Sequence, residues 1–77
     1  MFGLNKREKE VAARGVMSSV LSATGSAAYV RNVVLYNDRA EFFLAGPKNV
    51  DINAVTNLTG KPCSFDGAKI TMWGEYR

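Results

Sequence analysis

Two turn signals, each flanked by residues that favour β-strands, constrain the fold of this sequence more than any other feature. The strand-favouring runs cover residues 28–36, 39–45, 61–65 and 68–73. Asn37 and Asp38 separate the first two runs, and both residue types tolerate the positive φ angles of a two-residue hairpin turn. Asp66 and Gly67 separate the last two, and this dipeptide is a strong hairpin signal. The pattern predicts two antiparallel hairpins with turns at these dipeptides.

Helical signals precede each hairpin. Asn5 is followed three residues later by Glu8, a spacing that lets the two residues cap the first turn of a helix reciprocally. Apolar residues then recur at helical spacing, which predicts a long helix over residues 6–23. Between the hairpins, Asp51 is placed to cap a short helix over residues 52–59. The predicted element order is α-β-β-α-β-β.

A chain of 77 residues with 47% apolar residues supports a single α+β domain over residues 1–77 with one small core. Below about 80 residues such a core rarely supplies more than ~3–5 kcal/mol, so natural domains of this size often add disulfides, metals or subunit contacts. Cys63 is the only cysteine and histidine is absent, which excludes an intramolecular disulfide and the usual zinc ligand sets. Close packing or oligomerisation must therefore supply the stability.

Strand side chains alternate between the two faces of a sheet, so the expected turns also predict which residues share a face. The expected core-facing pairs are Leu35 with Ala40, Val33 with Phe42, Arg31 with Leu44, Phe65 with Ala68, Cys63 with Ile70 and Lys61 with Met72. These residues are nearly all apolar, and we expect them to meet the helices. The strand order within the sheet does not follow from the sequence.

The opposite face combines aromatic, aliphatic and charged side chains. Its candidate binding residues are Val34, Tyr36, Arg39, Phe43, Lys69 and Trp73, and Val30 is expected beside them. Glu41 is the only acid in the middle of a strand, and we expect it to pair with Arg39 or Lys69. A contiguous exposed patch of this kind usually marks an interaction site. The alternative is that the second helix covers this face within the same chain.

Catalytic and cofactor motifs are missing from the sequence. Without histidine, Ser-His-Asp and Cys-His arrangements are excluded. We expect Cys63 to be a buried, inert thiol, because free cysteine behaves mostly as a small hydrophobic residue. The sequence therefore predicts a protein that is not an enzyme and has no catalytic residue, metal, cofactor or small-molecule substrate.

No apolar run approaches the ~20 residues of a membrane span. The apolar stretch after the basic N-terminal residues is interrupted by serines and preceded by two glutamates, which does not fit a signal peptide. We therefore expect a cytoplasmic protein without membrane contacts.

Two functions fit the charged and aromatic face. The first is a protein-binding or assembly module that uses this face or a strand edge, in the simplest case as a homo-oligomer. The alternative is a single-stranded nucleic-acid binder, in which the three rings of the face stack on bases and its two cations meet phosphates. A net charge of +3 is only mildly basic, which favours the protein partner.

Overall fold

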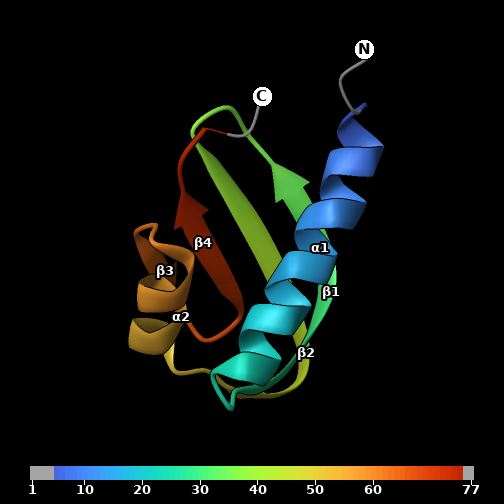
Figure 1. The fold of residues 1–77 in the computed structure, drawn as a ribbon. Helices are drawn as coiled ribbons and strands as arrows, with labels where there is room; N and C mark the ends of the chain where they lie inside the picture. Colours follow the sequence, from blue (N-terminus) through green and yellow to red (C-terminus); the bar gives the residue numbers. More distant parts are fainter. Residues whose placement is uncertain (1–4, 76–77) are drawn as a thin grey trace.

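The computed structural model describes residues 5–75, apart from the side chains of Lys6, Pro47 and Lys48, as two helices and a four-stranded antiparallel sheet (Figure 1). The elements are α1 (Lys6–Ala23), β1 (Ala27–Leu35), β2 (Arg39–Asn49), α2 (Ile52–Thr59), β3 (Cys63–Phe65) and β4 (Lys69–Trp73). This arrangement confirms the predicted α+β class and element order. No helix in the described part is long and apolar enough to cross a membrane.

Both helices begin at the predicted capping residues. The Asn5 side chain accepts a hydrogen bond from the Glu8 amide at 2.8 Å, and the Glu8 carboxylate accepts one from the Asn5 amide at 3.1 Å. In α2, the Asp51 carboxylate accepts from the Ala54 amide at 3.2 Å, and Gly60 ends the helix with φ +71°. These local signals explain why the bounds of both helices agree with the predicted ranges.

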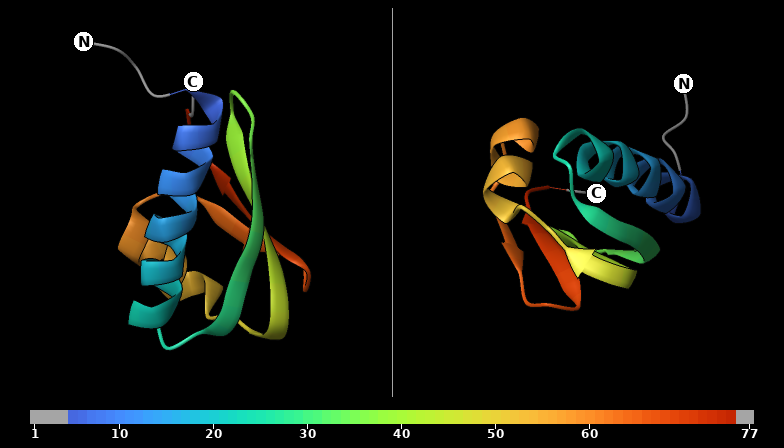
Figure 2. Two further views of the ribbon diagram at one scale, coloured as in Figure 1. Left: turned by 90° about the vertical axis from the view of Figure 1, so that its right-hand side faces the viewer. Right: turned by 90° about the horizontal axis from the view of Figure 1, so that it is seen from below.

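The strands lie in the order β1-β2-β4-β3, so the two hairpins are joined through β2 and β4. Phe42 pairs with Ile70 at this junction, and both side chains are fully buried. The two helices pack on the same face of the sheet, as the view from below in Figure 2 shows. The alternative in which the second helix covers the other face is therefore wrong.

A bulge in β1 changes which residues of the first hairpin face the core. Near the turn, Leu35 pairs with Ala40 and Val33 with Phe42, as predicted. A register shift between Val30 and Asn32 then brings Val30, not Arg31, opposite Leu44. Val30 is buried and Arg31 is exposed, so the prediction for these two residues is wrong. A β-bulge adds one residue to a strand and reverses the faces beyond it.

β2 continues through Asn49 rather than ending at Ala45. Gly46 has φ +76°, a conformation that glycine adopts without steric cost. Tyr29 pairs with Ala45 and Ala27 with Asn49, with an irregularity between the two pairs. The pairing of β2 with β1 therefore continues beyond Gly46.

The second hairpin turns at Gly67-Ala68, one residue later than predicted. Phe65 pairs with Ile70, and the Asp66 amide donates to the Lys69 carbonyl at 3.2 Å. The Asp66 carboxylate accepts hydrogen bonds from the Ala68 and Lys69 amides, both at 2.9 Å. Asp66 therefore stabilises the turn from the position just before it. The expected strand partners were wrong. The predicted faces of β3 and β4 are nevertheless correct, because the observed pairing differs from the predicted pairing by two residues and side chains two residues apart share a face.

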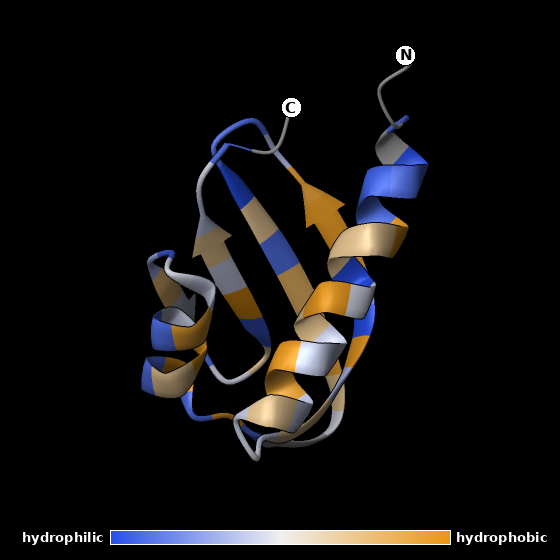
Figure 3. Ribbon diagram, in the orientation of Figure 1, coloured by the Kyte–Doolittle hydropathy of each residue, from blue (hydrophilic) through white to orange (hydrophobic). Residues whose placement is uncertain are grey.

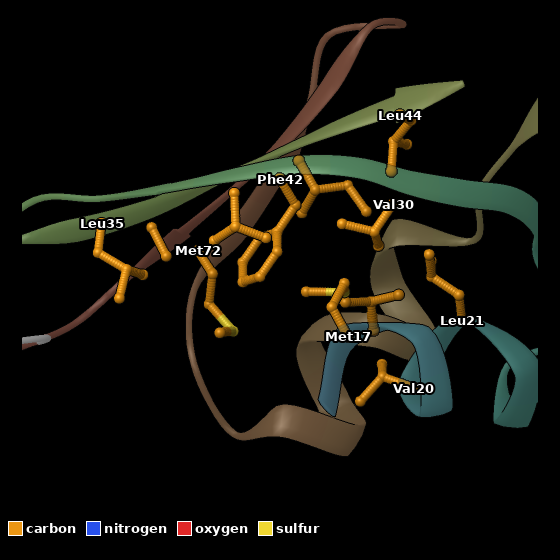
Figure 4. Close-up of a cluster of buried hydrophobic side chains, with 12 residues drawn as sticks. Met17, Val20, Leu21, Val30, Leu35, Phe42, Leu44 and Met72 are labelled. Atoms are coloured by element: carbon orange, nitrogen blue, oxygen red, sulfur yellow. The ribbon is translucent and has the colours of Figure 1, made fainter. Parts of the chain in front are cut away.

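The core lies between the helices and one face of the sheet (Figure 4). Its largest fully buried side chains are Phe42, Met17, Leu21, Ile70 and Val55. They come from β2, α1, β4 and α2, so all of these elements contribute to one hydrophobic cluster. Figure 3 shows the alternation of hydrophilic and hydrophobic residues along β2 that leaves polar groups on the opposite face.

Candidate functional site

The sheet face that points away from the helices forms the candidate site, and we call it the open face. It comprises Val34, Tyr36, Arg39, Glu41, Phe43, Ser64, Lys69, Thr71 and Trp73, which alternate with the buried residues of the same strands and turn. All six candidate residues from the sequence belong to it. Because strand pairing aligns residues across a sheet, these side chains lie in short rows perpendicular to the strands.

One row consists of Tyr36, Arg39 and Trp73. The Tyr36 amide donates to the Arg39 carbonyl at 2.8 Å, and Arg39 pairs with Trp73 across β2 and β4. The guanidinium carbon of Arg39 lies 3.9 Å from the centre of the Tyr36 ring and 6.0 Å from that of the Trp73 ring. Cations at these distances are attracted to the ring faces. The row holds its cation between two aromatic residues that remain 39% and 44% exposed.

Glu41 lies in the next row and links the cations on either side of it. Its Oε2 atom lies 3.1 Å from Lys69 Nζ and 3.5 Å from Arg39 Nε. This confirms the expected pairing and extends it, because Glu41 contacts both partners. Glu41 is only 8% exposed, and it is the one buried charged residue of the described chain. The hydrogen bond from Lys69 and the nearby charge of Arg39 hold the pKa of Glu41 below its usual value, against the effect of desolvation.

The remaining contacts bring the charge of the open face close to balance. Lys69 Nζ lies 5.6 Å from the centre of the Phe43 ring. Arg39 Nη1 also lies 2.9 Å from Asp38 Oδ1. Asp38 is a turn residue that was not among the candidate site residues from the sequence. Asp38 directly precedes Arg39 in the predicted turn, so the sequence already indicated that Asp38 lies next to the open face. Two cations thus face two carboxylates.

Among residues 5–75, no three His, Cys, Asp or Glu side chains gather closely enough to hold a metal ion. Cys63 is half-buried rather than buried, because it lies on β3 at the edge of the sheet. Its Sγ donates to the Lys61 carbonyl at 3.3 Å. The open face combines partly exposed rings with a balanced ion network.

Comparisons of this chain with protein-family models, with curated proteins and with solved structures found no match.

Proposed function

We propose that this domain is a non-enzymatic binding module whose open face docks on protein, in the simplest case on a second copy of itself. The observation that carries the proposal is that both helices pack on one face of the sheet. The other face keeps Tyr36 and Trp73 substantially exposed, with no described element over it. Aromatic residues and arginine are the residue types enriched at the centres of protein interfaces.

The charge arrangement supports a protein partner. Arg39 and Lys69 are already bound to Glu41, so a ligand gains no unpaired cation on this face. A near-neutral surface with exposed rings is suited to apolar burial. It also tolerates a second copy, because two such faces bring together balanced networks rather than like charges.

The size of the face sets the expected strength of association. Four strands spaced ~4.8 Å apart, each contributing a segment about five residues long at ~3.3 Å per residue, cover on the order of 300 Å². Standard protein interfaces bury about 800 Å² on each partner. The open face alone therefore supports a weak and reversible complex, with dissociation constants in the micromolar range or above.

The test is the oligomeric state as a function of concentration. We expect the average mass in sedimentation or light scattering to rise between ~10 μM and ~1 mM, the range of weak interfaces. Trp73→Ala should abolish the rise, whereas Leu58→Ala should leave it unchanged. Leu58 is a matched control because it is 56% exposed but lies on α2, away from the open face. A strict monomer throughout this range contradicts self-association.

Single-stranded nucleic acid is the alternative ligand. Binding would stack bases on Tyr36, Phe43 and Trp73, while Arg39 and Lys69 would have to exchange Glu41 for phosphate. Trp73 is the only tryptophan, so its fluorescence reports directly on such stacking. Quenching by mixed single-stranded DNA or RNA at ~50 mM salt, with affinity falling as salt rises, would replace the protein proposal by this one.

A further inference from the structure

A second surface of the molecule, separate from the open face, lies along the outer edge of β1. The strand order places β1 at one edge of the sheet and the three-residue β3 at the other. β1 is nine residues long, and among the described strands it pairs only with β2. The left view of Figure 2 looks toward this edge, where β1 runs beside α1. Free strand edges are sites at which extended peptides add to a sheet.

The outward-facing backbone groups belong to Val33 and Leu35. The Tyr36 amide donates to the Arg39 carbonyl, which points the backbone groups of Tyr36 toward β2. In an antiparallel pair the backbone groups of alternate residues point to opposite sides, so those of Val33 and Leu35 face outward. The bulge between Val30 and Asn32 interrupts this regular edge. The edge therefore offers only a short run of pairing, and a ligand strand needs further contacts to bind.

A groove between α1 and this edge supplies such contacts. It has a volume of about 130 Å³ and lies next to Val33. Its lining residues are Arg7, Glu10, Val11, Arg14, Asn32 and Val33. The four residues from α1 are spaced three and four apart, so they share one face of the helix. The groove therefore runs beside the regular part of the β1 edge.

The cations of this region are free to bind a ligand. Arg7 and Arg14 are exposed, as is Arg31 in the bulge, and none of them forms an ion pair with another residue of the described chain. Arg39 and Lys69 on the open face, by contrast, are both held by Glu41. Only Glu10 opposes the arginines within the groove. Two exposed arginines of the described chain without an ion-pair partner thus line the groove beside the β1 edge.

We propose that the β1 edge and the adjoining groove bind an extended acidic segment of another protein. The backbone of the segment pairs with Val33 and Leu35, and its carboxylates meet Arg7 and Arg14. A second copy of this chain is disfavoured at this edge, because symmetric pairing would bring the arginines of both copies together. A nucleic acid is also disfavoured, because the groove has no aromatic lining and the edge presents the alternating donors and acceptors of a peptide.

The test uses a labelled peptide of alternating valine and glutamate, followed by fluorescence anisotropy. We expect Arg7→Gln and Arg14→Gln each to weaken binding by about 1.5- to 5-fold, the range for exposed ion pairs. Lys9→Gln should leave the affinity unchanged, because Lys9 is an α1 cation outside the groove. Hydrogen exchange of the Val33 and Leu35 amides should slow in the complex. Trp73→Ala should bind the peptide normally, which separates this site from the open face.

Each part of the proposal has its own contrary result. Equal binding of a peptide with glutamine in place of glutamate would overturn the acidic ligand. Equal binding of a backbone N-methylated peptide would overturn strand pairing. Absence of binding up to ~1 mM peptide, the limit of weak specific association, would overturn the site as a whole. If the domain binds oligothymidylate more tightly than the acidic peptide, and this binding depends on Arg7 and Arg14, the two arginines bind phosphate groups and the proposal is wrong.

Discussion

Lys69 Nζ lies 3.1 Å from Glu41 Oε2 and so joins two strands that belong to different hairpins. Glu41 lies on β2 and Lys69 on β4, and this pair of strands connects the two halves of the sheet. Arg39 approaches the same carboxylate oxygen from the other side. The open face is therefore a stabilising part of the fold as well as the proposed binding surface.

Replacing Glu41 by Gln should destabilise the domain in a pH-dependent manner. The pKa of Glu41 in the folded protein is lowered from its usual value of 4.5, chiefly by the hydrogen bond from Lys69. The resulting stabilisation is fully present above pH ~4.5 and is lost as the pH falls through the lowered pKa. We expect Glu41→Gln to cost about 1–2 kcal/mol at pH 7, because its cationic partners are partly solvated. The difference should shrink toward pH 3 in urea denaturation, and a difference that grows on acidification would contradict the assignment.

Two glycines should respond to alanine in opposite directions. Gly15 lies within α1 with open space around it, so Gly15→Ala should stabilise the domain by about 0.5–1 kcal/mol. Gly46 has φ +76°, and an added Cβ would lie 3.3 Å from the Tyr29 ring. Gly46→Ala should therefore destabilise by about 1 kcal/mol or more. Thermal unfolding followed by circular dichroism measures both, and equal shifts for the two variants would refute the conformational explanation.

The junction of the two hairpins should dominate the stability of the core. Phe42 is fully buried, and Phe42→Ala should cost about 3–5 kcal/mol, which approaches the total stability of a domain of this size. Because that variant is expected to unfold, Ile70→Val provides a graded test with an expected loss of about 0.5–1.5 kcal/mol. Val11→Ala is the control, since Val11 is 62% exposed and its replacement should change stability by less than about 0.5 kcal/mol. A comparable loss for Ile70→Val and Val11→Ala in urea titrations would contradict this packing.

The N-terminal cap of α1 should contribute measurably to the fold. Asn5→Ala removes the side chain that accepts from the Glu8 amide, at an expected cost of about 1 kcal/mol. Hydrogen exchange should accelerate in the first turn of α1 more than in its last turn. Ser19→Ala, at an exposed position within the same helix, should change neither quantity appreciably.

The helix bounds and most of the sheet faces could be predicted because they depend on local chemistry. Asn5 and Asp51 cap their helices through neighbouring amides, and Gly60 ends α2 within its own turn. Apart from Val30, the membership of the open face was also predictable, since side-chain direction follows the odd or even position along a regular strand. This is why the incorrect partners of Cys63 and Phe65 left the predicted faces intact.

The bulge between Val30 and Asn32, the strand order and the placement of both helices on one face could not be predicted in the same way. Val30 is buried and Arg31 is exposed, which is the reverse of the predicted arrangement. The free energy gained by burying the valine and keeping the arginine in water offsets the cost of one irregular position in the strand pairing. The pairing of Phe42 with Ile70 joins residues far apart in the chain, and its stability depends on the helices that pack over it. Local patterns specify each hairpin and helix, whereas their mutual arrangement depends on the summed burial of side chains from every element. In the resulting arrangement, no described element covers the open face or the β1 edge.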